Sequence, residues 1–245
     1  MERNIRLTIA YDGTAYHGFQ RQANALTIQQ VLEEKLRLIF GHPLSIIGSG
    51  RTDTGVHAYG QVANFRTNGA IPTERIVKAA NGVLPEDIVV LDAEEANIAF
   101  HARKCAKQKT YVYRIYNGSL PNPFERNYAW QVNTKLDTDL MNTAASFVLG
   151  THDFSAFRAA GGALVNPVKT ILEAGCRREG DLVVFTFTGT GFLYHMVRNL
   201  VGTIADIGVR RRDPLEFEQI LKSRDRRLAG ATAPPQGLYL MHVLY

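Results

Sequence analysis

The order of strand and helix patterns along the chain predicts an α+β fold made of two similar halves, residues 1–105 and 106–245. Alternating apolar residues indicate short strands, and apolar residues spaced by three and four indicate helices. In the first half these patterns follow the order strand, helix, strand, strand, helix, strand, and the second half repeats this order coarsely. Such an order is typical of the ferredoxin-like, or split βαβ, arrangement. We therefore expect two ferredoxin-like halves with mostly antiparallel sheets and helices on the outer face.

The first half begins with an alternating pattern in which Leu7 and Ile9 would face a core. A helix is expected to start at Thr27, because Thr27 and Gln30 have the spacing of a capping box, and Gly41 would end it. The remaining elements of this half are short strands over 45–48, 61–66 and 88–93 and a helix over 73–83. Together these elements complete the βαββαβ order.

The second half shows the same kinds of pattern with one additional helix. Its first strand is expected over residues 110–116, where tyrosines alternate with other residues. Asp213 and Glu216 are spaced to cap a helix over 214–223. The other expected elements are helices over 137–149 and 193–207, strands over 170–178 and 182–188, and a closing strand over 238–244. Two such sheets joined side by side would leave a central basic cleft between the halves.

Composition limits the class of protein. Apolar residues make up 45% of the 245 residues and charged residues 21%, which is typical of a folded globular chain. Two cysteines, Cys105 and Cys176, are too few for a secreted disulfide scaffold. The first residues form no apolar signal segment, and no apolar run approaches the ~18–20 residues that span a bilayer. We therefore expect a cytoplasmic protein without membrane contact.

The distribution of positive charge favours a nucleic-acid partner. The net charge is +5, and an acid-free segment, residues 101–114, contains five basic residues: Arg103, Lys104, Lys107, Lys109 and Arg114. A second basic cluster, Arg210–Arg212, is followed by interleaved acids, as on a solvated helix face. The acid-free segment is therefore the better candidate for phosphate contacts, with an ordinary basic loop as the alternative.

The most unusual segment is a glycine-rich loop, Gly48–His57, with the sequence GSGRTDTGVH. Its three glycines indicate a backbone that turns tightly or approaches another group closely. The loop fits neither a dinucleotide-binding loop, which needs glycine in place of Asp53, nor a P-loop, which needs lysine in place of Val56. A carboxylate held rigidly in this way suits nucleophilic or acid–base catalysis. The simpler interpretation is a polar turn in which Asp53 bonds its own backbone.

Two further features leave alternatives open. Arg198 falls within an apolar run, so its guanidinium would need a carboxylate partner if buried, although it could equally reach solvent from a surface turn. Tyr111 follows the basic residues of the acid-free segment and could pack in a core or offer a stacking surface to an unpaired base. The histidines and cysteines lack metal-binding spacing, which disfavours a zinc site.

These segments together resemble the tRNA pseudouridine synthase A (TruA) family. The matching motifs lie at residues 10–22, 48–62, 109–114, 150–154 and 191–198. They occur in the family's order over almost the whole chain, and the Arg-Thr-Asp-x-Gly-Val-His motif is highly specific. The resemblance implies an isomerase that converts uridine to pseudouridine at positions 38, 39 and 40 of the tRNA anticodon stem-loop, without cofactor or metal. It also implies a homodimer in which one tRNA contacts both subunits.

The resemblance further implies roles for single residues. Asp53 matches the catalytic aspartate, and Arg198 matches the arginine paired with it. Arg51 matches the arginine that helps to displace the target nucleotide, and Tyr111 matches the tyrosine that packs on the target uracil. Phosphate contacts are expected from the acid-free segment, from Arg103, Lys107, Lys109 and Arg114.

Two other functions remain alternatives at this point. A non-enzymatic RNA-binding module would explain the basic residues but not the glycine-enclosed Asp53. A hydrolase of nucleosides or sugars would use two carboxylates a few ångströms apart, and no second acid stands out near Asp53. The sequence leaves open whether Asp53 attacks C1′, attacks the uracil ring or acts as a base, which uridine reacts fastest, and which group accepts the C5 proton.

Overall fold

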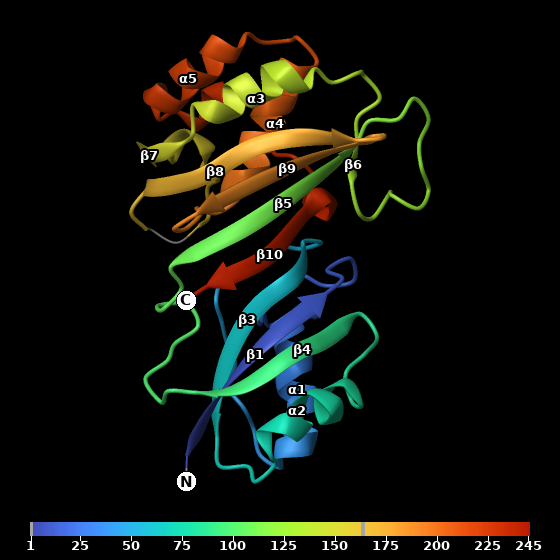
Figure 1. Ribbon diagram of the computed structural model, residues 1–245, viewed down its shortest axis with the longest axis vertical. Helices are drawn as coiled ribbons and strands as arrows, with labels where there is room; N and C mark the ends of the chain where they lie inside the picture. The colour runs from blue at the N-terminus through green and yellow to red at the C-terminus, as the bar shows by residue number, and fades with distance from the viewer. Residues whose placement is uncertain (1, 163–164) are drawn as a thin grey trace. The chain divides into compact units, whose positions relative to one another are not determined.

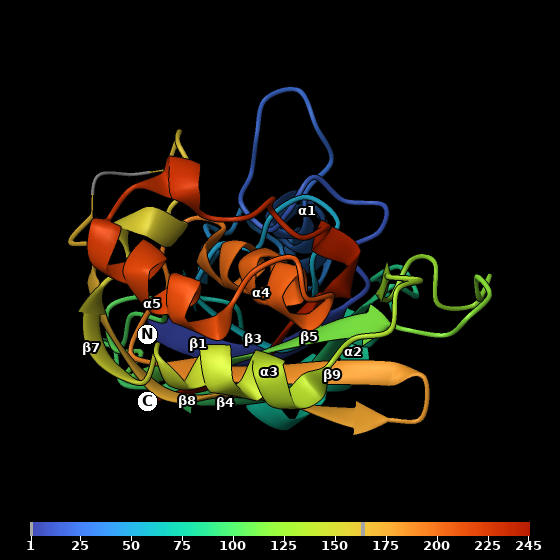
Figure 2. The ribbon, with the colours of Figure 1, turned by 90° about the horizontal axis from the view of Figure 1, so that it is seen from above.

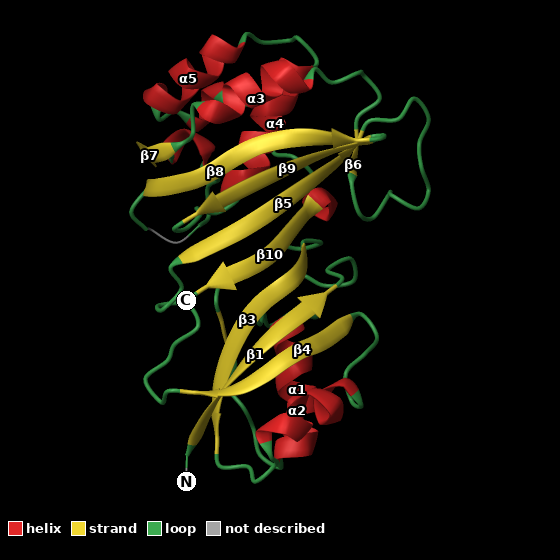
Figure 3. Cartoon of the chain, in the orientation of Figure 1, coloured by secondary structure: helices red, strands yellow, loops and turns green. Residues whose placement is uncertain are grey.

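The computed structural model describes residues 2–162 and 165–245, which form five α-helices, ten β-strands and three short 3-10 turns (Figures 1 and 3). The chain divides into two compact units, residues 1–107 with 239–245, and residues 108–238. The closing strand thus belongs to the first unit, whereas the expected second half runs to residue 245. Both units combine a sheet with helices, so the fold is of the mixed α/β type. No helix in the described ranges has the length and apolar character needed to cross a membrane.

The first unit is a sheet with two helices. Its strands follow the order β4-β1-β3-β10, in which β1 is antiparallel to both neighbours and β10 is parallel to β3. The elements are β1 (Arg3–Tyr11), α1 (Ile28–Phe40), β2 (Ile47–Gly48), β3 (His57–Thr67), α2 (Thr73–Asn81), β4 (Ile88–Ala96) and β10 (Leu238–Leu244). Phe40 of α1 meets Phe65 of β3 edge to face, with ring centroids 5.1 Å apart, and both rings are buried. The helices therefore cover one face of this sheet.

Helix α1 begins and ends as its sequence predicts. The Thr27 hydroxyl accepts the backbone N–H of Gln30 over 3.3 Å, and Gly41 ends the helix in the left-handed region at φ 76°. The Gln30 side chain donates to Glu34, one turn further along the helix. Thr27 therefore caps the helix as predicted, but the Gln30 side chain does not bond back to the Thr27 backbone as it would in a full capping box. Both ends of the helix are therefore set by local chemistry.

The second unit is an antiparallel sheet with three helices grouped together (Figures 1 and 2). Its strands follow the order β5-β9-β8-β7. The elements are β5 (Gln108–Tyr116), β6 (Trp130–Gln131), α3 (Thr138–Ser146), β7 (Gly150–Asp153), β8 (Val168–Glu179), β9 (Leu182–Gly189), α4 (Met196–Gly208) and α5 (Pro214–Ser223). Asn142 of α3 bonds both the N–H and the carbonyl of Cys176 on β8, at 2.7 and 2.9 Å. The Asn142 side chain therefore bonds backbone groups of β8 at a part of its edge that β7 does not pair with.

Several predicted bounds differ from the observed ones. Strand β3 begins at His57 rather than at 61, because pairing with β10 extends it toward the glycine-rich loop. Helix α4 begins at Met196 rather than at 193, because His195 has a left-handed backbone at φ 58° that a helix cannot include. Strands β6 and β7 have only two and four residues and were not expected. Helix α5 and strand β10 have the predicted bounds.

Gly202 allows a close approach that the fold of the second unit requires. It lies inside α4, and a Cβ there would fall 1.8 Å from the carbonyl oxygen of Ala231. The clashing atom belongs to the backbone, which cannot rotate away as a side chain can. We therefore expect this contact to fix how residues 229–234 pack on α4.

Gly202→Ala tests this packing. Alanine in a helix interior normally gains up to about 1 kcal/mol over glycine, but the clash should reverse the sign and lower the free energy of unfolding by roughly 1–3 kcal/mol. Gly82→Ala is the matched control, because its nearest atoms lie 3.4 and 3.5 Å away and its backbone is helical. Urea unfolding followed by circular dichroism measures both. Unchanged stability of Gly202→Ala would contradict the close approach.

Candidate active site

The glycine-rich loop joins β2 to β3 and carries Asp53. Two fully buried side chains fix its start. The Ser49 hydroxyl donates to Gln61 Oε1 over 2.6 Å, and Gln61 Nε2 donates to the carbonyl oxygen of Gly50 over 3.0 Å. Because Gln61 lies on β3, the sheet itself sets where the loop begins. Sequence reasoning gave Gln61 no role, although it belongs to one of the matching motifs.

Thr52, the residue before Asp53, is held through both its backbone and its side chain. The N–H of Phe19 donates to the Thr52 carbonyl over 3.1 Å. The Tyr11 hydroxyl and the Thr52 hydroxyl are 2.8 Å apart and hydrogen-bonded. Gly18, at φ 85°, makes room for this contact, because a Cβ there would fall 2.5 Å from the Thr52 carbonyl oxygen. The end of β1 and the loop after it therefore determine the position of Asp53.

The residues after Asp53 form a tight turn against the same segment. The N–H of Val56 donates to the Asp53 carbonyl over 3.1 Å, and the N–H of Gly55 donates to the Tyr16 carbonyl over 3.2 Å. Gly55 is left-handed at φ 75°. A Cβ on Gly13 would fall 2.0 Å from the Val56 carbonyl oxygen, so this glycine permits the two segments to touch. The result is a half-buried Asp53 on a backbone that is constrained on both sides.

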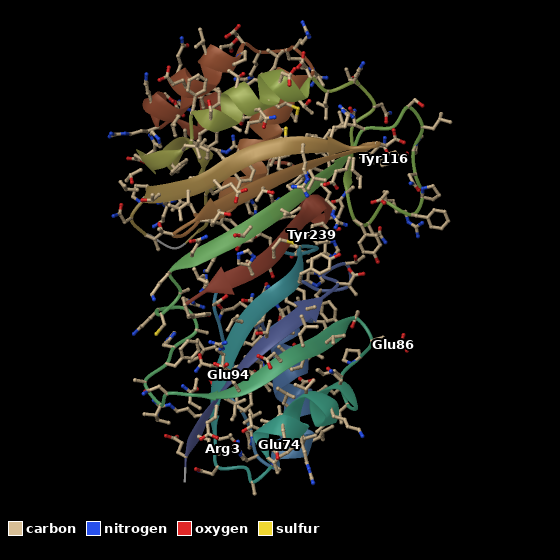
Figure 4. All side chains as sticks on the ribbon, in the orientation of Figure 1. Arg3, Glu74, Glu86, Glu94, Tyr116 and Tyr239 are labelled. Atoms are coloured by element: carbon tan, nitrogen blue, oxygen red, sulfur yellow. The ribbon has the colours of Figure 1, made fainter. Side chains whose placement is uncertain are left out.

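His57 closes the loop and is a residue to which sequence reasoning gave no separate role. Its side chain is buried, and Nδ1 lies 3.1 Å from both the Gly13 nitrogen, whose N–H it accepts, and Asp12 Oδ1. The ring stacks on Tyr239 of β10, which is labelled in Figure 4, at 4.8 Å between centroids, and Tyr239 stacks in turn on Tyr59 at 5.7 Å. The closing strand of the chain thus supports the loop through an aromatic stack.

Arg51 lies on the exposed side of the loop, two residues before Asp53. Its Nε donates to Gln20 Oε1 over 2.6 Å. This bond restricts the exposed guanidinium of Arg51. It also connects Arg51 to the segment after β1 that holds Thr52 through Phe19. Arg51 and Asp53 therefore share one rigid support in the first unit.

The second unit carries Tyr111 and Tyr113 on β5, and the structure distinguishes them. Tyr113 is a core residue whose hydroxyl donates to the Pro234 carbonyl over 2.7 Å, and burial raises the pKa of this hydroxyl. Tyr111 is also buried, at 8% exposed, but it retains a small exposed part, and its ring meets Phe192 edge to face at 5.0 Å. The ring of Tyr111 is therefore fixed by a neighbour on the loop before α4.

Arg198 lies in the first turn of α4 and is half-buried. Its Nε donates to the Ala233 carbonyl over 2.8 Å, and the N–H of Ala233 donates back to the Arg198 carbonyl over 3.1 Å. The positive charge of Arg198 also acts on Tyr113, where it opposes the increase that burial causes in the pKa of the hydroxyl. The side chain is thus folded onto the chain and does not extend from a surface turn.

The basic residues separate into two groups. In the acid-free segment, Arg103, Lys104 and Lys107 are exposed in the first unit, and Lys109 and Arg114 are half-buried on β5 of the second. In the second cluster, Arg210 lies 2.7 Å from Asp137, and Arg211 lies 3.5 Å from Asp206. These carboxylates offset part of the charge of the second cluster, which agrees with the weaker role expected for it.

Burial of the Tyr11 hydroxyl predicts a pH dependence of stability. Burial raises the pKa of Tyr11 from 10.0 to about 12, against the opposing effect of the Thr52 hydrogen bond. The contribution of the protonated Tyr11 to the free energy of unfolding is therefore complete below pH 10.0. It is lost as the pH rises to about 12, because unfolding releases a proton between these two values. Tyr11→Phe should lower stability at pH 8 by about 1 kcal/mol and make its decline with alkaline pH shallower. Urea unfolding between pH 8 and 11.5 measures both effects, and equal slopes for the two proteins would contradict the assignment.

Comparison with known proteins gives a consistent result. A family model described as tRNA pseudouridine synthase matches residues 7–104 and 144–245. A tRNA pseudouridine synthase A from Thermoanaerobacter sp. (strain X514) is 46% identical over 243 residues, covering 99% of this chain and 100% of the relative. One from Acetivibrio thermocellus is 48% identical over the same length and coverage. A chain from a crystal structure of a Cbf5-Nop10-Gar1 complex has a TM-score of 0.42 and 12% identity, covering 96% of this chain and 48% of that chain.

The curated relatives match almost the whole chain, and the family model matches parts of both units that include the glycine-rich loop and α4 but not β5. They define the class of protein, an isomerase that forms pseudouridine in tRNA. The chain belongs to the tRNA pseudouridine synthase A (TruA) family.

Proposed function

We propose that this enzyme isomerises uridines 38, 39 and 40 of the tRNA anticodon stem-loop and uses Asp53 as its only catalytic carboxylate. Family membership supplies the reaction, and the nucleotide positions and residue roles are the proposal. The observation that carries it is the construction of the loop. Thr52, Gly55 and Val56 are all hydrogen-bonded through their backbones, which fixes a half-buried carboxylate in their midst. Such fixed placement is what a reacting group requires.

The chemistry needs one ionised carboxylate and no redox partner. The N1–C1′ bond of uridine breaks, the uracil turns, and C5 bonds to C1′. The C5 proton is lost and N1 gains a proton, so substrate and product are isomers. Asp53 would attack C1′, attack the ring or remove a sugar proton, and each route starts from the ionised form.

Arg198 would pair with Asp53 and favour that ionised form. Its anchoring to Ala233 supports this role, because the Nε bond restricts the side chain and directs the terminal nitrogens. An arginine fixed in this way loses little conformational freedom when it meets a carboxylate. Arg198 would therefore set both the charge and the orientation of Asp53.

The target base must leave the stem before it can react, at a cost of a few kcal/mol. We assign Arg51 to displacing the nucleotide, since its guanidinium is exposed on the loop that carries Asp53. Tyr111 would stack on the extruded uracil, and its edge contact with Phe192 supports a fixed ring. Stacking of this kind contributes roughly 1–3 kcal/mol per base, which offsets much of the cost of extrusion.

The remaining parts of the proposal concern architecture and partners. The order β1-α1-β2-β3-α2-β4 supports a ferredoxin-like first half, and we propose a second such half with a central basic cleft between them. Phosphates of the tRNA would contact Arg103, Lys107, Lys109 and Arg114. The family resemblance supports a cytoplasmic homodimer in which one tRNA contacts both subunits.

Asp53→Asn tests the catalytic role most simply. The amide keeps the shape of the side chain but removes the charge, so pseudouridine formation should fall by on the order of 10²–10⁴-fold or more. The Kd for tRNA should stay within about twofold, because the phosphate contacts are intact. Asp92→Asn, an exposed carboxylate on β4, is the matched control and should keep wild-type activity. Retained activity in Asp53→Asn, or release of free uracil by the wild type, would contradict the proposal.

The phosphate contacts predict a change in salt dependence. Each contact adds about 0.7–0.9 to the slope of log K against log salt, so replacing both Lys107 and Lys109 with Ala should flatten the slope by roughly 1.4–1.8. Replacing Arg210 and Arg211, which pair with acids, should leave the slope unchanged. Filter binding of tRNA at several salt concentrations measures this. An unchanged slope in the lysine variant would remove these residues from the interface.

A further inference from the structure

The position of Arg198 depends on a segment with no regular secondary structure. Ala233, which both accepts from and donates to Arg198, lies in residues 229–234, between the 3-10 turns Arg226–Leu228 and Pro235–Gly237. A segment of this kind has no helix or sheet ladder to hold its shape. Its geometry must therefore come from side-chain contacts.

Asn199, the residue after Arg198, provides the central contact. It is fully buried, and its Oδ1 accepts from the Thr232 hydroxyl over 2.6 Å and from Arg226 Nη2 over 3.1 Å. Its Nδ2 donates to the Phe157 carbonyl over 2.8 Å. The amide is thus hydrogen-bonded at both ends and joins α4 to the irregular segment.

Arg226 holds the segment from its other side. Nη1 donates to the carbonyls of Ala229 and Gly230, at 3.3 and 3.0 Å, and Nη2 donates to the Thr232 hydroxyl over 3.1 Å. These partners are neutral oxygens, so the guanidinium acts through its fork of donors and not through an ion pair. In sequence, Arg226 belongs with the basic residues that follow Arg210–Arg212, but its contacts are internal to the chain.

Two further contacts complete the support of the segment. The N–H of Gly230 donates to the Thr203 hydroxyl over 3.0 Å, and the Tyr113 hydroxyl donates to the Pro234 carbonyl over 2.7 Å. The segment is therefore bound to α4 and to β5 on either side of Ala233. Displacing it would displace the oxygen that holds Arg198.

We propose that Arg226, Asn199 and Thr232 form a latch that positions Arg198 for its partnership with Asp53. This inference rests on the proposed pairing of Arg198 with Asp53. The latch residues are positioning residues, because they act through Ala233 and touch neither the tRNA nor the reacting atoms. A displacement of about 1 Å in a positioned catalytic group can cost on the order of 10²-fold in rate.

Thr232→Val tests the latch, because valine keeps the shape of threonine and removes only the hydroxyl that joins Asn199 to Arg226. We expect single-turnover pseudouridine formation to fall about 10–100-fold, with the Kd for tRNA within twofold of wild type. A fall in rate without a fall in tRNA affinity separates this effect from a loss of folded protein, which would lower both.

Two controls accompany this variant. Thr232→Ser keeps the hydroxyl and should restore the rate. Thr151→Val removes another hydroxyl pair of the same unit, the 2.8 Å contact with Thr170, and should leave the rate unchanged. If Thr232→Val does not fold, Arg226→Lys makes the same test, since it keeps the charge but loses the fork of donors.

A double-mutant cycle with Arg198→Lys separates the latch from the function on which it rests. If the latch acts through Arg198, Thr232→Val should have almost no further effect on the rate of Arg198→Lys. An undiminished further loss would overturn the latch while leaving the role of Arg198 intact. Full activity of Arg198→Met, which has no positive charge, would instead overturn the proposed pairing with Asp53, and the latch with it.

Discussion

The hydrogen bonds that hold Thr52 are the interaction on which the rest of the site depends. Thr52 is bound through its carbonyl by Phe19 and through its hydroxyl by Tyr11, so the residue before Asp53 has little freedom. Tyr11 is the last residue of β1, whose register against β3 and β4 is fixed by the buried face of the sheet. The register of β1 therefore helps to set the position of Thr52, and so of Asp53, through the Tyr11 hydrogen bond. Reaction at a single carboxylate needs this kind of fixed placement more than it needs further functional groups.

The second unit holds Arg198 in place in a similar way. Arg198 is held by a carbonyl of an irregular segment, and that segment is held by the buried Asn199 and by the half-buried Thr232 and Arg226 that bond to it. In both units internal hydrogen bonds make an irregular segment rigid, and that segment carries Asp53 in the first unit and holds Arg198 of α4 in the second. Buried polar groups of this kind are stable only when their partners are complete, which explains why small substitutions around them are expected to have large effects on rate.

Local chemistry explains which parts of the fold the sequence predicts. Helices α1 and α5 have capping residues within their own sequence, and Thr27 and Asp213 perform the expected role. Strands β6 and β7 have no such local determinant, because a strand of two or four residues exists only through its partner strand. The sequence likewise singles out the glycine-rich loop, but its spacing could not show how deeply each tyrosine of β5 is buried. The contacts of Arg226 could not be predicted either, because nothing near it along the chain indicates that it bonds the carbonyls of Ala229 and Gly230 and the side chain of Asn199.

The central proposal is that one positioned carboxylate isomerises three neighbouring uridines with protein and tRNA alone. The most direct measurement incubates the purified protein with unmodified tRNA in a chelating buffer without nucleotide and maps pseudouridine at single-nucleotide resolution. The account predicts pseudouridine at positions 38, 39 and 40 with the tRNA chain intact and no uracil in solution. Pseudouridine confined to other positions, or a strict requirement for an added metal or nucleotide, would contradict it.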